Sequence, residues 1–145
     1  HMDILRGRAY PTILTPHEGE FRRVGGQLGQ DRATAAMEFA RENGCILLLK
    51  GHRTLITDGA VCYENHTGNP GMATGGSGDV LTGILLSLLA QGYDSIDAAR
   101  IAVYVHGLAG DLAAGVKGET ALVAGDIIDY LPLAWRSLER KETRP

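Results

Sequence analysis

One short stretch of the chain combines the glycines, the hydroxyl and the carboxylate that phosphate chemistry uses. It reads, in order, Gly75, Gly76, Ser77, Gly78 and Asp79. Because glycine has no Cβ, its backbone can take left-handed or tightly curved conformations and lets a ligand approach closely. The apolar run that follows predicts a helix, whose first N–H groups lack partners and carry the positive end of its dipole. The stretch therefore suits a phosphate-binding loop, with a glycine-rich turn capped by Ser77 or Asp79 as the alternative.

Asp79 is the candidate catalytic residue of this stretch. A carboxylate beside a bound phosphate repels it, unless the carboxylate takes a proton from a nucleophile or helps to hold a metal ion. Such a reaction needs a hydroxyl between the carboxylate and the phosphorus atom. The alternative is an aspartate in the first helical turn whose oxygens accept backbone N–H groups.

Three further polar residues follow runs that read as strands. Lys50 ends a buried apolar run, and His17 and Glu20 follow a β-branched run. Ligands of open α/β sheets bind at the carboxyl ends of the strands. A lysine there can pair with a phosphate, a histidine can donate to substrate oxygens, and a glutamate can hold magnesium through water. A solvated lysine and ordinary helix capping are the alternatives.

The elements that must position these residues can be read from the hydrophobic pattern. Short apolar or β-branched runs predict strands, and longer runs with helical spacing or stop signals predict helices. A helix between two buried strands is typical of a βαβ unit, so we expect an α/β fold. The predicted strands are residues 11–15, 45–49, 54–57 and 61–64, and Asp58 and Gly59 predict a hairpin turn between the last two. A short helix is predicted to start at 17–21 and to be broken at Gly25 and Gly26. The other predicted helices are 31–43, which Gly44 ends, 80–91, which is apolar almost all round and is expected in the core, 95–114 and 122–138, before a charged tail at 139–145 that we expect to fray.

The length, composition and net charge indicate which class of protein the chain belongs to. The chain has 145 residues, is 44% hydrophobic and carries a net charge of −3, so we expect one globular domain over residues 1–145 that binds neither nucleic acid nor membranes.

Cys45 and Cys62 lack the spacing of a zinc site and are interpreted as free thiols. No signal peptide or membrane-spanning run is visible, and a cytoplasmic location is predicted. His1 and Met2 are interpreted as a cloning scar.

A second group of polar residues lies in the long predicted helix at 95–114. His106 and Asp111 stand there among small residues such as Gly107 and Gly110. A stripe of small residues is typical of close helix packing. We therefore interpret His106 as a buried histidine with satisfied hydrogen bonds rather than as a catalytic group.

Four segments, taken together, resemble the NAD(P)H-hydrate dehydratase family of the ribokinase-like superfamily. They occur in the family's order, and the resemblance extends from about Pro11 to about Leu131. The joint pattern is specific, whereas no single segment is. The four segments are residues 15–21 (Thr-Pro-His-Glu-Gly-Glu-Phe), 49–54 (Leu-Lys-Gly-His-Arg-Thr), 68–81 (from Gly-Asn-Pro-Gly to Asp-Val-Leu) and 103–111 (from Val-Tyr-Val-His to Gly-Asp).

The resemblance implies a fold and a reaction. The fold would be a three-layer α/β sandwich with a mostly parallel central sheet. The reaction would use ADP or ATP to repair hydrated NADH or NADPH. The terminal phosphoryl group would pass to the hydroxyl on the damaged nicotinamide ring, and the phosphate would then leave by elimination.

The resemblance also implies roles for individual residues. Asp79 would take the proton of the substrate hydroxyl, and His17 would contact the hydrated cofactor. Mg²⁺ would be held through phosphates and water, with Glu20 as a possible outer-shell helper. The nucleotide and its phosphates would be bound by Lys50, Gly51, His52, Arg53, Thr54, Gly75, Gly76, Ser77 and Gly78.

The chain departs from the family in length. Domains of this family are roughly twice as long, and we expect the first strands of the sheet to be missing before residue 1. An uncovered sheet edge favours association, so a homo-oligomer is expected. Two alternative functions stay open. One is a ribokinase-like kinase of a vitamin precursor, and the other is a non-catalytic fragment that binds nucleotide or oligomerises.

Overall fold

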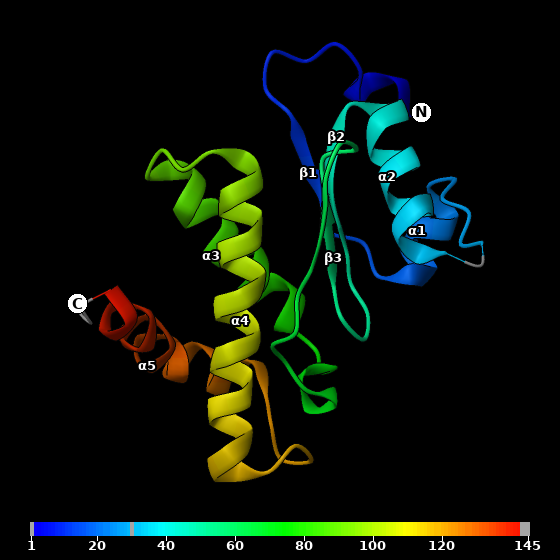
Figure 1. Ribbon diagram of the computed structural model, residues 1–145. Coiled ribbons are helices and arrows are strands. Elements are labelled where there is room, and N and C mark those ends of the chain that lie inside the picture. The colour runs from blue at the N-terminus through cyan, green and yellow to red at the C-terminus, as the bar shows by residue number, and fades with distance from the viewer. Residues whose placement is uncertain (1, 30, 143–145) are drawn as a thin grey trace. The chain divides into compact units, whose positions relative to one another are not determined.

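The computed structural model describes residues 2–29 and 31–142, without the side chains of 140–142. Two compact units are present in this part of the chain (Figure 1). The first comprises the described residues up to Asn65 together with Gly92–Arg100, and the second comprises His66–Gln91 and the residues from Ile101 onwards. The assignment of all 145 residues to one domain stays a prediction. The cloning-scar interpretation of His1 and the end of the predicted frayed tail, 143–145, lie outside the described residues.

The first unit contains a four-stranded sheet, in which neighbouring strands follow the order of the chain. The β1–β2 pair is parallel, and the β2–β3 and β3–β4 pairs are antiparallel. All residues of β2 are buried, as its continuous apolar run predicts. The strands are β1 (Thr12–Leu14), β2 (Cys45–Leu49), β3 (Leu55–Thr57) and β4 (Cys62–Glu64).

The mostly parallel sheet that the resemblance implies is therefore not what these four strands show. The connections after β2 and β3 are short, and a short connection joins antiparallel strands because a parallel pair needs a long crossover. The turn at Asp58 and Gly59, predicted from the sequence, joins β3 to β4, and Gly59 has a φ of 92°. The α/β class itself is confirmed.

Three helical segments belong to the first unit: a 3₁₀ turn η1 (Met2–Leu5), α1 (Glu18–Arg23) and α2 (Arg32–Asn43). The ends of α2 follow the sequence signals, since the Asp31 carboxylate accepts from the Ala33 N–H and Gly44 ends the helix with a φ of 60°. Phe21 of α1 and Phe39 of α2 meet edge to face, with ring centroids 5.0 Å apart. Both rings belong to the core that β2 completes, and Figure 1 shows the two helices beside the sheet.

The second unit is helical. Its core is formed by side chains from α4 and α5, and α3 packs against α5. Tyr104 and Trp135 pack on this core, as expected for large aromatic residues. The elements are η2 (Pro70–Met72), α3 (Ser77–Ala90), α4 (Ser95–Lys117), which belongs to this unit from Ile101 onwards, and α5 (Ala124–Glu142), which continues through Pro132.

The start of α3 differs from the prediction. The helix begins at Ser77 rather than at Val80, because Gly76 takes a φ of 87° and turns the chain directly into the helix. Ser77, Gly78 and Asp79 therefore lie in the first helical turn. The helix also exposes Leu86, so it buries one face rather than its whole surface.

Cys45 and Cys62 are free, as predicted, and Cys45 is the more deeply buried of the two. Burial raises the pKa of the Cys45 thiol to about 11. Among the helices of residues 2–29 and 31–142, none combines the length and the apolar character that crossing a membrane requires.

Candidate functional site

The glycine loop (residues 75–78) leads into a helix terminus that no side chain caps. The alternative of a turn capped by Ser77 or Asp79 is thus not what the structure shows. The N–H of Ser77 makes a long contact of 3.3 Å to the carbonyl oxygen of Thr74. A Cβ placed on Gly75 would meet no atom within 4 Å, so the loop leaves open space beside it. An uncapped terminus beside open space is suited to an anion.

Asp79 is exposed in the first turn of α3. Within the described part of the chain, its carboxylate makes no hydrogen bond and no ion pair. The alternative, a carboxylate satisfied by backbone N–H groups, is therefore not observed. An exposed carboxylate without a partner can approach a substrate hydroxyl and accept its proton.

Asp111 of α4 anchors the segment that precedes the glycine loop. Its carboxylate accepts from the Gly68 N–H at 2.8 Å and from the Asn69 side-chain amide at 2.9 Å. The Asn69 amide oxygen in turn accepts from the Gly71 N–H at 3.1 Å and caps η2. One carboxylate thus fixes both the backbone and the side chain at the entry to the loop.

The segment before the glycine loop packs closely against small residues of α4. A Cβ on Gly107 would lie 2.2 Å from the Thr67 hydroxyl, and a Cβ on Gly110 would lie 2.2 Å from the Met72 sulfur. The Thr67 hydroxyl donates to the Tyr104 carbonyl at 2.9 Å. The prediction of close packing is correct, but the packed partner is the segment before the glycine loop rather than only another helix.

His106 of α4 contacts the first residue of α3. Its Nε2 atom lies 2.9 Å from the Ser77 carbonyl oxygen and 3.3 Å from the Ser77 hydroxyl. A carbonyl oxygen can only accept, so this contact assigns a proton to Nε2. His106 is hydrogen-bonded, as predicted, and its partner is a residue of the glycine loop. It is partly buried rather than fully buried, so the burial part of the prediction is wrong.

An ion pair joins the end of α4 to the first turn of α5. Lys117, at the end of α4, contacts the buried carboxylate of Asp126 in the first turn of α5. The Asp126 carboxylate also accepts from the Val123 N–H at 2.9 Å. The Lys117 ammonium and this N–H hold the pKa of Asp126 below its usual range.

The segment between Lys117 and Asp126 packs against Gly71 of η2 and Gly76 of the glycine loop. A Cβ on Gly71 would lie 2.5 Å from the Glu119 carbonyl oxygen, and a Cβ on Gly76 would lie 3.1 Å from the Ala124 Cβ. Gly76 is therefore required twice, for its positive φ and for its close neighbour.

The second group of candidate residues lies in the first unit, at the ends of β1 and β2. His17 and Lys50 form a parallel bridge, and the Lys50 N–H donates to the Pro16 carbonyl at 2.8 Å. The strand-end placement predicted for both residues is confirmed.

His17 and Glu20 cap the N-terminus of α1 reciprocally. The His17 Nδ1 atom accepts from the Glu20 N–H at 3.1 Å, and the Glu20 carboxylate accepts from the His17 N–H at 2.8 Å. Because Nδ1 accepts, the ring proton is on Nε2, 3.5 Å from the other Glu20 oxygen. The backbone hydrogen bond from His17 lowers the pKa of Glu20, and the charge of Lys50 contributes. The capping alternative is thus correct for both residues, and Nε2 remains the donor of His17.

The β2–β3 loop (residues 50–54) contains the other predicted nucleotide-binding residues. Gly51, His52 and Arg53 are exposed, and Thr54 is partly buried. Arg53 has a φ of 62°, a backbone conformation that side chains other than glycine rarely adopt. Its guanidinium pairs with Glu64 at 3.1 Å.

The donor set fits Mg²⁺ only as an ion held through phosphates. Among the described residues, no three His, Cys, Asp or Glu side chains come together as a metal site. Mg²⁺ commonly keeps several waters and uses one or two carboxylates together with substrate phosphates. Asp79 and Glu20 are the candidate carboxylates, and neither belongs to a preformed cage.

The structure brings the predicted residues together in two groups. His17, Glu20 and the β2–β3 loop lie in the first unit, and the glycine loop and Asp79 lie in the second. Two contacts were not expected from the sequence. One is that of Arg32 with the β2–β3 loop, and the other is that of His106 with Ser77. Each contact joins residues that lie far apart in the sequence, so no local pattern of residues predicts it.

Comparison with known proteins places the chain in a family. A family model described as NAD(P)H-hydrate dehydratase matches residues 1–133. A bifunctional NAD(P)H-hydrate repair enzyme from Moorella thermoacetica is 49% identical over an alignment of 144 residues, and the match covers 95% of this chain and 27% of the relative. The chain therefore spans about a quarter of the length of that relative.

Two solved structures are similar in fold and sequence. One is an ADP/ATP-dependent NAD(P)H-hydrate dehydratase from Bacillus subtilis, co-crystallised with ATP and Mg²⁺. It is 38% identical, with a TM-score of 0.83, and the match covers 92% of this chain and 52% of that one. The other is a ribokinase-like superfamily protein from Enterococcus faecalis, 34% identical with a TM-score of 0.78, covering 89% of this chain and 46% of that one.

These matches confirm the ribokinase-like α/β class and the resemblance seen in the sequence. The family model covers the segments that contain both groups of candidate residues. The chain belongs to the NAD(P)H-hydrate dehydratase family.

Proposed function

We propose that the protein dehydrates hydrated NADH or NADPH with the help of an adenine nucleotide, which would make it a metabolite-repair lyase. The observation that carries the proposal is the placement of Asp79. This carboxylate is exposed and unpartnered in the first turn of α3, directly after an uncapped glycine loop. Family membership supports the reaction, and the placement of Asp79 supports its proposed role as a base beside the helix terminus.

The chemistry is a phosphoryl transfer followed by an elimination. Asp79 accepts the proton of the ring hydroxyl while the hydroxyl oxygen attacks the terminal phosphorus of the nucleotide. The bond from that phosphorus to the bridging oxygen breaks, and AMP leaves when ADP is the donor. The carbon–oxygen bond of the phosphorylated ring then breaks, and inorganic phosphate departs with the bonding electrons. A proton leaves the adjacent ring carbon, and the electrons of that C–H bond form the restored ring double bond.

The glycine loop would hold the transferring phosphoryl group. The N–H groups of Gly76, Ser77 and Gly78 are the proposed donors, because fixed donors stabilise charge that develops in the transition state. The 3.3 Å contact from the Ser77 N–H to Thr74 is long enough to be exchanged for a stronger charged acceptor.

The first-unit residues would bind the two substrates. We assign the hydrated cofactor to His17, whose Nε2–H can donate to a polar oxygen. The nucleotide is assigned to Lys50, Gly51, His52, Arg53 and Thr54. Mg²⁺ bound to the phosphates would neutralise their charge, with Asp79 or the anionic Glu20 as carboxylate contacts through water.

The M. thermoacetica relative and a B. subtilis relative that is 40% identical are named for NAD(P)H-hydrate repair and dehydration, which favours this function over a vitamin-precursor kinase. The B. subtilis protein of the solved structure is named for both ADP and ATP, so both nucleotides belong in the test. A cytoplasmic location, a homo-oligomer and the absence of nucleic-acid binding stay predictions.

The experiment is an assay of the 145-residue chain with hydrated NADH, Mg²⁺ and either ADP or ATP. We expect the absorbance of NADH to return in proportion to the nucleotide consumed. No return with either nucleotide would remove the catalytic claim for this chain. Thermal shift with ADP tests binding separately, and the non-catalytic alternative predicts a shift without turnover.

A further inference from the structure

The β2–β3 loop has a backbone that other residues must hold in place. Arg53 is the one non-glycine residue with a positive φ in the described part of the chain. Such a conformation costs free energy in an L-residue, and it persists where the surroundings determine it. The Arg53 side chain pairs with Glu64, but that ion pair lies on the surface and does not itself hold the loop backbone.

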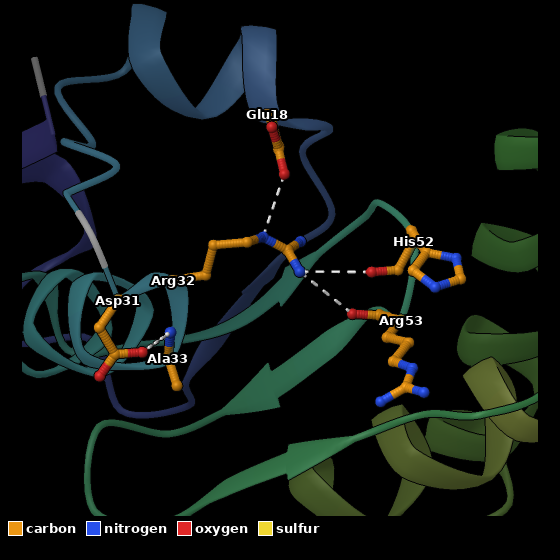
Figure 2. A network of polar contacts seen from close by, with 6 residues as sticks. All are labelled: Glu18, Asp31, Arg32, Ala33, His52 and Arg53. Atoms are coloured by element: carbon orange, nitrogen blue, oxygen red, sulfur yellow. Dashed lines mark hydrogen bonds and ion pairs between the residues drawn. The ribbon is translucent and has the colours of Figure 1, made fainter.

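Arg32 supplies the missing constraint. Its Nη1 atom donates to the carbonyl oxygens of His52 and Arg53, each at 3.4 Å, as Figure 2 shows. One planar guanidinium thus contacts two successive carbonyl groups of the loop. Arg32 is the first residue of α2, whose N-terminus is fixed by the Asp31 cap.

Glu18 fixes the other side of the guanidinium. The Arg32 Nε atom lies 3.0 Å from a Glu18 carboxylate oxygen, as an ion pair rather than an aligned hydrogen bond (Figure 2). Glu18 is the first residue of α1, directly after His17. The start of α1 and the β2–β3 loop are therefore connected through one arginine.

Gly51 provides the space for this contact. A Cβ on Gly51 would lie 2.8 Å from Arg32 Nη2 and 3.5 Å from the Glu18 carboxylate. The φ of Gly51 is not positive, so glycine is needed here for space rather than for conformation. The absence of a side chain at Gly51 therefore allows the Arg32 guanidinium to approach the loop.

We infer that Arg32 is a positioning residue that holds the β2–β3 loop in its nucleotide-binding conformation. The inference rests on the proposed function, which assigns residues 50–54 to the nucleotide. A loop that is ordered before binding loses less conformational entropy when the ligand arrives. Loss of Arg32 therefore weakens nucleotide affinity without touching the glycine loop. The pair with Glu18 connects this ordering to the segment that contains His17.

The test compares Arg32→Lys and Arg32→Met with the matched control Arg41→Met, an exposed arginine of the same helix. Lysine keeps the charge but cannot contact two carbonyl groups and Glu18 at once. We expect both Arg32 variants to bind Mg–ADP about tenfold more weakly by calorimetry. Pyrophosphate, a probe of the glycine loop alone, is expected to bind them as it binds wild type. Arg41→Met is expected to bind both ligands normally.

Three outcomes would overturn the inference. Wild-type ADP affinity in Arg32→Lys would show that the fork-shaped contact is not needed, and this variant carries the test if Arg32→Met fails to fold. Equal losses of ADP and pyrophosphate affinity, with a lowered melting temperature, would make Arg32 a residue of general stability. If wild type itself binds no ADP, the proposed function falls together with the inference.

The role of Glu18 has its own test. Glu18→Gln is expected to weaken ADP binding in wild type and to have no further effect in Arg32→Met, because it acts through the guanidinium. Additive losses in the double variant would contradict the connection between α1 and the loop.

Discussion

His106 donates from Nε2 to the carbonyl oxygen of Ser77, 2.9 Å away, across the 29 residues that separate them in the chain. The same nitrogen lies 3.3 Å from the Ser77 hydroxyl. Because Nε2 carries the proton, it cannot accept the hydrogen of that hydroxyl. The hydrogen of the Ser77 hydroxyl is therefore not directed to His106, and the carbonyl contact fixes the first residue of α3.

This relationship predicts different outcomes for two substitutions of His106. Glutamine places an N–H near the position of Nε2 and is expected to keep pyrophosphate affinity within about threefold of wild type. Leucine has similar bulk but no donor and is expected to weaken it about tenfold, which corresponds to one hydrogen bond of about 1.4 kcal/mol. Calorimetry measures both. Equal affinities for the two variants would contradict the assigned hydrogen bond.

Substitutions of Gly76 and Gly75 are expected to have different effects, the first on stability and the second on nucleotide affinity. Gly76→Ala introduces a side chain at a φ of 87° and 3.1 Å from Ala124, so it is expected to lower the free energy of unfolding by about 1–2 kcal/mol. Gly75→Ala meets no atom within 4 Å and is expected to unfold like wild type. The new methyl group occupies the space proposed for the phosphate, however, so ADP affinity should fall. A Gly75→Ala variant that binds ADP normally would contradict this placement of the ligand.

Asp111 is expected to stabilise the segment that precedes the glycine loop. Asp111→Ala removes the acceptor for the Gly68 N–H and for the Asn69 amide, and is expected to cost about 1–3 kcal/mol of unfolding free energy. Asp129→Ala, an exposed aspartate of α5, serves as the control. Urea unfolding measures the difference. Equal stability of the two variants would show that the anchor contributes nothing.

The Lys117–Asp126 pair predicts a pH dependence of stability. The lowered pKa of Asp126 means that its contribution is present above the unfolded-state value, about 4, and is lost as the pH falls through the lower folded value. The raised pKa of Lys117 means that its contribution is present below about 10.4 and is lost as the pH rises through the folded value. Asp126→Asn should flatten both slopes of melting temperature against pH. Unchanged slopes would contradict a contribution of this ion pair to the pH dependence of stability.

Local signals predicted most of the elements. The run of apolar residues at Cys45–Leu49 gave the buried strand β2, and Asp31 and Gly44 marked the two ends of α2. The hairpin at Asp58 and Gly59 was likewise visible in the sequence. The start of α3 was predicted too late because the left-handed conformation of Gly76, and not the apolar run, begins that helix.

The contacts that support the candidate site could not be predicted in this way. Arg32 meets a carbonyl group 20 residues away, and His106 meets Ser77 only because α4 runs beside the start of α3. Such pairs depend on packing between elements, which hydrophobic spacing does not specify. His17 shows the intermediate case, since its place at a strand end was visible but its reciprocal capping with Glu20 was one of two open interpretations.

The central claim is that Asp79 accepts the proton of the substrate hydroxyl, and Asp79→Asn tests it most directly. Asparagine has the same shape but cannot act as a base at neutral pH. We expect this variant to bind ADP as wild type does and to lose turnover of hydrated NADH by a factor of about 100 to 10,000, the usual contribution of a general base. The measurement is NADH formation beside ADP calorimetry on the same preparation. Retained turnover, with ADP bound normally, would contradict the account.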